Sequence, residues 1–153
     1  MFVQRVRPGW DEYFLEIALV IAKRSTCLRR IYGAVLVRDR IIVSTGYNGA
    51  ARGEENCIDT GRCVREEMNV PKGQRYELCA GVHAEQNAII NGNPEKMKGA
   101  TIYIAGVNAD GSYTSGEPCL ICRRMIINAM IERVVYLDEK GCPVEKTHLT
   151  GNG

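Results

Sequence analysis

The chain has 153 residues, of which 45% are hydrophobic and 25% are charged. This length and composition suit a globular protein with one core, so we expect residues 1–153 to form a single domain. The formal net charge of +2 has both signs interspersed, whereas a protein that grips long nucleic acid gathers its basic residues in a stripe. No apolar run reaches the roughly 20 residues that cross a bilayer, and the first residues lack the order of a signal peptide. We therefore expect a cytoplasmic protein with neither a membrane nor long nucleic acid as its partner.

Seven cysteines are many for a cytoplasmic chain of this size. Their odd number argues against a fully paired disulfide framework, and a reducing cytosol argues against one again. Thiolates gathered around metal explain these cysteines better.

The first predicted element is a helix that starts at Asp11, with Trp10 and Leu15 spaced as a hydrophobic staple. Apolar residues recur at helical spacing as far as Ile21 and mark a buried face.

A basic cluster follows this helix, where Lys23, Arg24, Arg29 and Arg30 flank Cys27. The cluster is either a solvated helix end whose cations complement the helix dipole, or a site for one small phosphate.

Two strands are predicted next, over residues 32–38 and 41–46, joined by a tight turn at Asp39 and Arg40. The region 49–80 then lacks clear periodicity and is long for an unstructured loop. Something other than a hydrophobic core must order this irregular region.

The second half of the chain alternates helices and strands. We expect a helix over 83–91, a strand over 99–106, a polar loop over 107–117, a helix that opens at Pro118, and strands over 132–137 and 144–149. The last strand should be antiparallel to its predecessor, because a parallel one would require a crossover of about a dozen residues. The predicted fold class is α/β, a three-layer α/β/α sandwich around a mixed, mostly five-stranded sheet.

The residues that point to chemistry lie at the starts of two predicted helices. Cys119 and Cys122 are three residues apart, so their sulfurs project from one face, where the helix N-terminus favours thiolate. With His83 they form a three-ligand zinc set that leaves the fourth position for water. Glu85 could take a proton from that water, whose pKa zinc lowers to about 7.

Each of these residues alone has a simpler explanation. His83 would be a hydrogen-bonded structural histidine, and Glu85 a charge at a helix terminus. Cys119 and Cys122 would be a redox dithiol or half of a structural zinc site. The combination of H-x-E with P-C-x-x-C is far more specific, and it is the signature of zinc-dependent nucleobase deaminases.

Over roughly residues 8–137 the chain resembles the deoxycytidylate (dCMP) deaminase family, within the cytidine deaminase-like superfamily. Besides the zinc signature, the resemblance rests on the segments WDEYFLEIA, AKRSTCLRR, GAVLVRD, STGYNGA, ELCAGVHAEQNAI and CRRMIINA. The pair GYNGA and HAEQNAI is more typical of this family than of cytidine or tRNA-adenosine deaminases.

The resemblance implies hydrolytic deamination of dCMP to dUMP and ammonia, which would supply dUMP for thymidylate synthesis. Zinc-bound hydroxide would attack C4 of the cytosine while Glu85 shuttles protons. Asn48 of GYNG would bind the deoxyribose, and the backbone amide of Ala84 the pyrimidine O2. Ser25 and Arg29 match positions associated with the substrate phosphate, which Arg29 can grip with two donors.

The resemblance also bears on the other cysteines. Cys27 and Cys57 match positions that carry ligands to a second, structural zinc in related enzymes, and Cys63 and Cys79 could complete a four-thiolate site. The alternative is four reduced cysteines packed as small hydrophobes. Cys142 fits neither site.

Two departures limit the resemblance. The loop 107–117 is longer than the family's usual link before P-C-x-x-C, and it could form a lid or an intersubunit contact, or merely be tolerated. The tail after Tyr136 is short, in a region that other members use for regulation. The resemblance further implies a homo-oligomer, often a hexamer, that dCTP activates and dTTP inhibits.

Other functions remain open. The same chemistry could act on free cytidine, a modified dCMP or a tRNA base, although the nearly neutral charge counts against tRNA. A non-catalytic, zinc-stabilised interaction module would close its metal sites and would not need Glu85. A dithiol oxidoreductase would reversibly oxidise Cys119 with Cys122.

Overall fold

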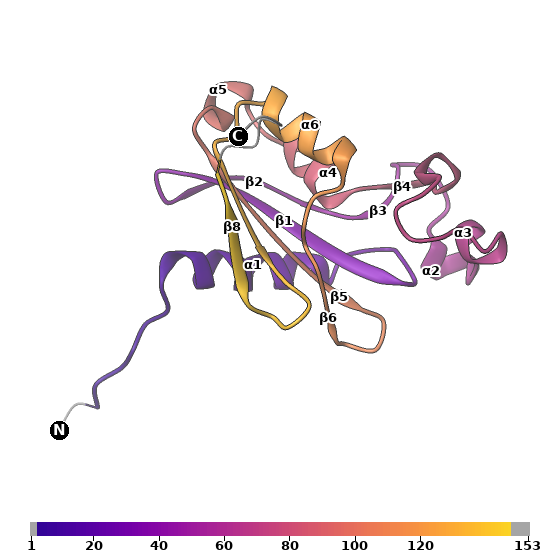
Figure 1. The fold of residues 1–153 in the computed structure, drawn as a ribbon, viewed down its shortest axis with the longest axis horizontal. Helices are drawn as coiled ribbons and strands as arrows, with labels where there is room; N and C mark the ends of the chain where they lie inside the picture. Colours follow the sequence, from indigo (N-terminus) through magenta and orange to yellow (C-terminus); the bar gives the residue numbers. More distant parts are fainter. Residues whose placement is uncertain (1–2, 148–153) are drawn as a thin grey trace.

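Figure 1 shows the fold in a computed structural model, which describes residues 3–147. A mixed sheet has the main strand order β2-β1-β5-β7-β8, and β6 pairs with β5 off this path. The bounds are β1 Arg30–Arg38, β2 Ile41–Tyr47, β5 Thr101–Asn108, β6 Tyr113–Thr114, β7 Arg133–Leu137 and β8 Pro143–Lys146. The β5–β7 pair is parallel, and the other pairs in this sheet are antiparallel.

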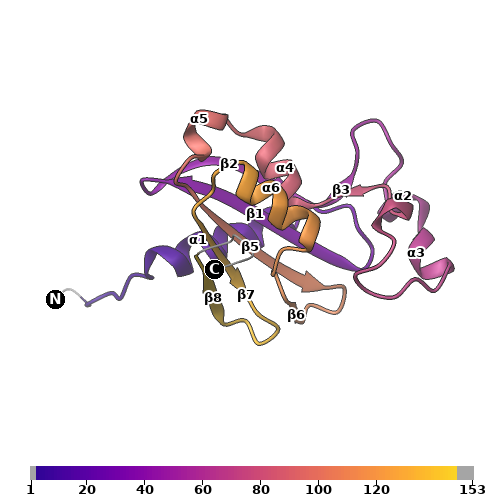
Figure 2. The same cartoon turned by 45° about the horizontal axis from the view of Figure 1, so that its top comes forward.

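Helices cover both faces of the sheet, as Figures 1 and 2 show. One face is covered by α1 (Trp10–Ala22), and the other by α4 (Ala84–Asn91), α5 (Pro94–Met97) and α6 (Leu120–Asn128). Successive residues of β1 alternate between the two cores, since Leu36 packs in the cluster with α4 and α6 while Val35 and Val37 pack in the cluster with α1. The predicted α/β/α sandwich is confirmed. No helix within residues 3–147 is both long and apolar enough to span a bilayer.

Two glycines allow helices to approach the sheet closely. A Cβ atom at Gly33 would lie 2.0 Å from the backbone oxygen of Ala18 in α1. A Cβ atom at Gly46 would lie 2.4 Å from the backbone oxygen of Ala84 in α4. A side chain at Gly46 would therefore displace the helix that begins directly after His83.

The amino-terminal elements lie close to their predicted positions. The helix α1 begins at Trp10, one residue early, and the Trp10 ring stacks on Phe14 with centroids 5.9 Å apart. The predicted staple, with Trp10 outside the helix, is therefore wrong. Asp39 and Arg40 have φ of 52° and 64°, as a two-residue hairpin turn between β1 and β2 requires.

The segment 107–117 is more regular than the predicted polar loop. The strand β5 continues through Asn108, and the chain turns at Gly111 and returns as β6, which pairs Thr114 with Gly106. This part of the chain therefore extends the sheet as a short hairpin. The helix α6 begins at Leu120, two residues after the predicted start at Pro118.

The last strand is antiparallel to its neighbour, as predicted. It spans Pro143–Lys146, and residues 148 and 149 of the expected strand lie outside the described residues.

The irregular region 49–80 contains only short elements: β3 Gly49–Ala50, α2 Cys57–Thr60, α3 Val64–Glu67 and η1 Tyr76–Leu78. The strand β3 pairs with β4 (Gly81–Val82), just before α4. Figure 2 shows this region projecting from one end of the sandwich. Neither buried cluster contains a residue of 49–80, so the hydrophobic core does not order it.

An ion pair and a hydrogen bond join α1 to the strands β5 and β7. Asp11 accepts hydrogen bonds from Arg133 Nη1 and Nη2 at 2.9 and 2.6 Å and from the Tyr103 hydroxyl at 2.7 Å. The hydrogen bond from Arg133 is the main reason that the pKa of Asp11 lies below its ordinary value.

Asp11→Asn should lower the free energy of unfolding by about 1 kcal/mol at pH 7, a value reduced for the partial exposure of the pair. Because the native pKa of Asp11 is lowered, its contribution is fully present above the unfolded pKa of about 3.9 and is lost as the pH falls through the native pKa. Urea unfolding of both proteins from pH 7 to pH 2 measures this. The exposed neighbour serves as a control, since Glu12→Gln should change little. If the free energy of unfolding of Asp11→Asn stayed below that of the wild type by the same amount in strong acid, the lowered pKa of Asp11 would not be the cause.

Candidate active site

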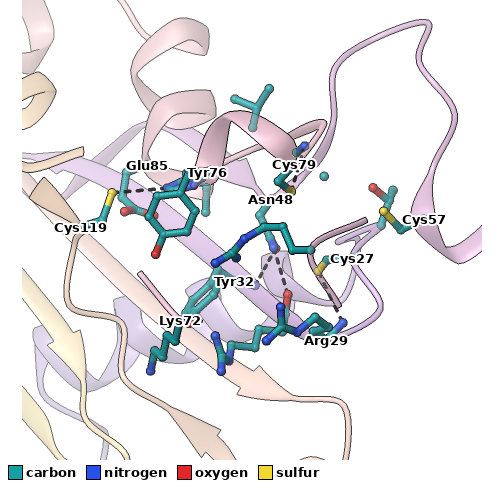
Figure 3. A pocket seen from close by; sticks show the side chains of 18 of the residues that line it. Cys27, Arg29, Tyr32, Asn48, Cys57, Lys72, Tyr76, Cys79, Glu85 and Cys119 are labelled. Carbon is teal, nitrogen blue, oxygen red and sulfur yellow. Dashed lines mark hydrogen bonds between the residues drawn. The ribbon is translucent and has the colours of Figure 1, made fainter. Parts of the chain in front are cut away.

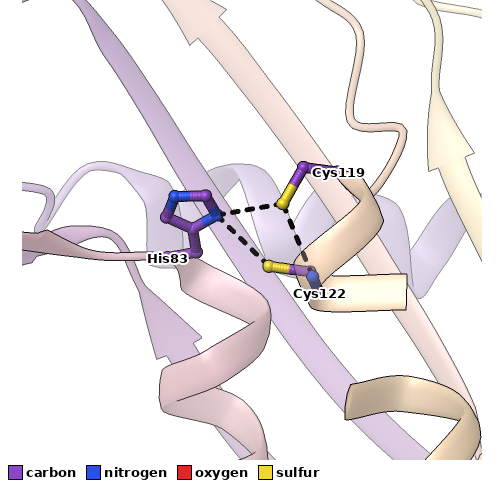
Figure 4. A group of neighbouring side chains, drawn as sticks. All are labelled: His83, Cys119 and Cys122. Carbon is purple, nitrogen blue, oxygen red and sulfur yellow. Dashed lines mark hydrogen bonds between the residues drawn. The ribbon is translucent and has the colours of Figure 1, made fainter. Parts of the chain in front are cut away.

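Three predicted ligands come together where α4 and α6 begin. Figure 4 shows the side chains of His83, Cys119 and Cys122 converging on one point. His83 Nδ1 lies 3.2 Å from Cys122 Sγ and 3.7 Å from Cys119 Sγ. The three ligand atoms lie within 4.8 Å of one another, and within residues 3–147 this is the one such group.

The helix N-termini hold this group in place. His83 is the N-cap of α4, where its backbone N–H donates to Gln86 Oε1 at 2.9 Å in a capping box. Cys119 is the N-cap of α6, where its sulfur accepts from the Cys122 N–H at 3.4 Å. Both helix dipoles thus direct partial positive charge at the thiols and favour thiolate.

The protonation of the three side chains is coupled. A hydrogen bond from the Cys122 thiol lowers the pKa of Cys119 to about 4, and this bond together with burial raises the pKa of Cys122. The hydrogen bond with Cys119 raises the pKa of His83. The two thiols and the imidazole therefore share protons with one another. Two sulfurs and one imidazole nitrogen are also a donor set that suits zinc.

Glu85 lies beside the group without belonging to it. Its side chain is 6% exposed, and its carboxyl group contacts the Cys122 thiol. Burial raises the pKa of Glu85. The carboxyl group is therefore placed to exchange protons with whatever binds at the three ligands.

A pocket of about 410 Å³ opens beside Glu85, and ligand pockets range over roughly 300–1,000 Å³. In the view of Figure 3, Glu85 and Cys119 lie at one end and Cys57 at the other, with Asn48 and Cys27 between them. The pocket thus runs from the three-ligand group to the irregular region.

Asn48 and Ala84 both line this pocket. The Asn48 amide donates to the Arg30 carbonyl at 2.9 Å and accepts from the Tyr32 N–H at 2.8 Å. These bonds orient Asn48, and its amide retains a further donor and acceptor position for a ligand. The N–H of Ala84 belongs to the first turn of α4, which has no acceptor within the helix.

The two residues predicted to contact a phosphate lie differently. Arg29 lines the pocket, with its Nε 3.1 Å from Glu66 Oε1. Ser25 is buried, accepts from the Cys27 N–H at 3.2 Å, and is outside the lining of the pocket. Arg30 of the same basic cluster also lines the pocket.

Four further thiols line this pocket, those of Cys27, Cys57, Cys63 and Cys79. The Arg29 N–H donates to Cys27 Sγ at 3.5 Å, and the Gly81 N–H to Cys79 Sγ at 3.3 Å. Burial and then the other three thiols raise the pKa of Cys57. Among the described residues these sulfurs do not form a group as compact as that of His83.

Arg65 and Tyr76 also line the pocket, although the sequence motifs do not mark them. The Tyr76 ring lies edge-on to His83, with centroids 5.1 Å apart, and the Arg65 guanidinium lies 4.8 Å from the Tyr76 centroid. Both residues come from one-turn helices in the irregular region, where no periodicity exists to find them. The only sequence signal is the position of Tyr76 shortly before His83 in the chain.

Comparisons with known proteins agree with this geometry. A family model described as the cytidine and deoxycytidylate deaminase zinc-binding region matches residues 8–138. The deoxycytidylate deaminase of Mycobacterium phage D29 is 42% identical over 137 residues, which cover 87% of this chain and 98% of the relative. The deoxycytidylate deaminase of Schizosaccharomyces pombe is 39% identical over 132 residues, which cover 86% of this chain but only 38% of the relative.

A solved structure supports the same relationship. The crystal structure of apo dCMP deaminase from the cyanophage S-TIM5 has a TM-score of 0.59 and 25% identity, covering 87% of this chain and 86% of that chain. The chain belongs to the cytidine and deoxycytidylate deaminase family, whose zinc-binding region covers residues 8–138.

Proposed function

We propose that this protein hydrolyses dCMP to dUMP and ammonia. The observation that carries the proposal is a buried Glu85 beside a His/Cys/Cys group at the end of a pocket of about 410 Å³. The 42% identity to a phage deoxycytidylate deaminase favours dCMP over other cytosine compounds.

One Zn²⁺ would be held by His83, Cys119 and Cys122. The group has three members within residues 3–147, and catalytic zinc sites have three protein ligands and an open fourth position. When bound, zinc lowers the pKa of a water ligand to about 7 and so supplies a nucleophile at neutral pH. A non-catalytic module would instead need a fourth protein ligand, and nothing in it would require a buried Glu85.

Glu85 would move the protons of the reaction. As a water oxygen bonds to C4 of cytosine, Glu85 accepts a proton and delivers it to N3. A second proton passes to the amino group, the C4–N bond breaks, and ammonia leaves. One water is consumed and no electron is transferred. The burial of Glu85 keeps bulk water from competing for these protons.

The substrate would be oriented by residues of the sheet and of α4. Asn48, fixed by two backbone hydrogen bonds, would bind the deoxyribose, and the Ala84 N–H would bind the pyrimidine O2. Arg29 would contribute positive charge toward the phosphate, with Ser25 supporting the adjoining backbone.

A second zinc would bind Cys27, Cys57, Cys63 and Cys79. Their shared position in the pocket and the N–H donors to the Cys27 and Cys79 sulfurs support this site. Such donors favour thiolates, and metal would supply the order that the hydrophobic core does not give to the irregular region.

Further properties are proposed on other grounds. Length and composition favour a single domain over residues 1–153 and a cytoplasmic location. The family resemblance alone favours a homo-oligomer such as a hexamer, activation by dCTP, inhibition by dTTP, and the supply of dUMP for thymidylate synthesis.

His83→Ala and Cys122→Ser should each remove about one zinc per chain, because either change leaves two of the three ligands. Metal analysis of the purified proteins measures this. Cys142→Ser, an exposed thiol in the β7–β8 turn, should retain the wild-type metal content. Full zinc content in both ligand variants would contradict the assignment.

Glu85→Gln should lower kcat for ammonia release from dCMP by roughly 10²- to 10⁴-fold, since a general acid–base group is lost, while the zinc content stays unchanged. Glu95→Gln is the matched control, because Glu95 also lies in the first turn of a helix but is exposed. Wild-type turnover in Glu85→Gln would disprove the proton transfer, and a wild type inactive toward dCMP would disprove the proposed reaction.

Wild-type protein should contain two zincs per chain, and Cys57→Ser should contain one while keeping the zinc at His83. The remaining metal can be located by combining Cys57→Ser with His83→Ala, which should leave none. One zinc per chain in the wild type would rule out the second site.

A further inference from the structure

Arg65 is a buried cation in the wall of the pocket. It lies in α3 and is 8% exposed. Its Nε is the one buried side-chain nitrogen or oxygen without a hydrogen-bond partner among the described residues. Buried guanidinium groups are normally paired, because an uncompensated charge is costly to remove from water.

The rest of the Arg65 side chain is fixed. Nη2 donates to the Pro71 carbonyl at 3.1 Å and to the Gln74 carbonyl at 3.0 Å, and the guanidinium carbon lies 4.8 Å from the Tyr76 ring centroid. Arg65 thus holds the segment from Pro71 to Tyr76 in place while its Nε remains unused.

This segment forms one wall of the candidate active site. Tyr76 contacts His83 edge-on, so one aromatic ring separates the Arg65 guanidinium from a residue of the three-ligand group. Lys72 of the same segment lines the pocket, and in the view of Figure 3 it lies below Tyr76. Two cations, those of Arg65 and Lys72, therefore line the same pocket as Glu85.

No carboxylate within residues 3–147 forms an ion pair with Arg65. Arg29, by contrast, pairs with Glu66 at 3.1 Å. Arg65 is therefore a buried cation of this wall that has no ion-pair partner among the described residues.

We propose that Arg65 is a substrate-binding residue whose Nε–H donates to the phosphate of a nucleoside monophosphate. The inference rests on the proposed function, since it assigns a further contact to the same substrate. A phosphate would neutralise the buried charge and complete the hydrogen bonds of the guanidinium. A nucleoside without phosphate would leave Arg65 unpaired, so Arg65 would select for the phosphorylated form.

The zinc-loaded wild-type protein can be tested by NMR of its arginine side chains, with the Nε–H resonance of Arg65 assigned from its loss in Arg65→Lys. Addition of dUMP, which is not turned over, should shift this resonance, and deoxyuridine should not. A resonance that dUMP leaves unmoved would overturn the proposal. This result does not depend on catalysis or on the folding of a variant.

Affinities provide the second measurement. Arg65→Met should weaken dUMP binding by roughly 10- to 100-fold, the equivalent of one charged hydrogen bond, and should leave deoxyuridine binding unchanged. The matched control is Arg62→Met, which removes an exposed arginine paired with Glu67 and should alter neither affinity. Equal losses for both ligands would show that Arg65 only supports the pocket wall, and would refute a phosphate contact.

The two hypotheses can fail separately. Wild-type protein that shifts the Arg65 resonance with dUMP but releases no ammonia from dCMP would disprove the proposed reaction and retain the Arg65 contact. Wild-type protein that releases ammonia from dCMP but shows no shift of the Arg65 resonance with dUMP would retain the proposed reaction and disprove the Arg65 contact.

Discussion

The close approach of α4 to the sheet is the constraint on which the rest of the site depends, because His83 caps α4 and Glu85 lies in its first turn. Gly46 makes this approach possible, since any Cβ atom there would lie 2.4 Å from the helix backbone. Asn87 and Asn91 then bind the edge of β2, with amide donors 2.8 and 3.0 Å from backbone carbonyls of that strand. These hydrogen bonds satisfy backbone carbonyls of β2, an edge strand, and hold α4 against it along the length of the helix. His83 and Glu85 are thereby positioned by a helix packed on the sheet and not by a flexible loop.

The second half of the site reaches this point by a different route. The hairpin of β5 and β6 returns the chain toward the sheet, and from there it enters α6 at Cys119. The thiols approach His83 although more than thirty residues separate them in the sequence. A metal ion bound here would link the starts of α4 and α6, so metal binding would stabilise the packing of both helices.

Much of this arrangement could be predicted from the sequence, because its elements bury one or two apolar faces. The alternating residues of β1 and the helical spacing of α1 both reflect contact with a core. The convergence of His83, Cys119 and Cys122 could be predicted because each residue lies at a helix N-terminus with a defined spacing. The hairpin within 107–117 was missed because a two-residue strand carries no periodic signal. Arg65 and Tyr76 were missed for a related reason, since their contacts with one another and with His83 are tertiary.

The irregular region therefore differs physically from the sandwich to which it is attached. Its residues lie outside both hydrophobic clusters. Many of its contacts are polar, such as the Arg65 bonds to backbone carbonyls and the amide donors to cysteine sulfurs. A segment held in this way gains stability from whatever anion or metal satisfies its cations and thiols. The clusters that position α4 and α6 contain no residue of 49–80, so a substitution in the irregular region can alter the wall of the pocket without removing a contact from either core.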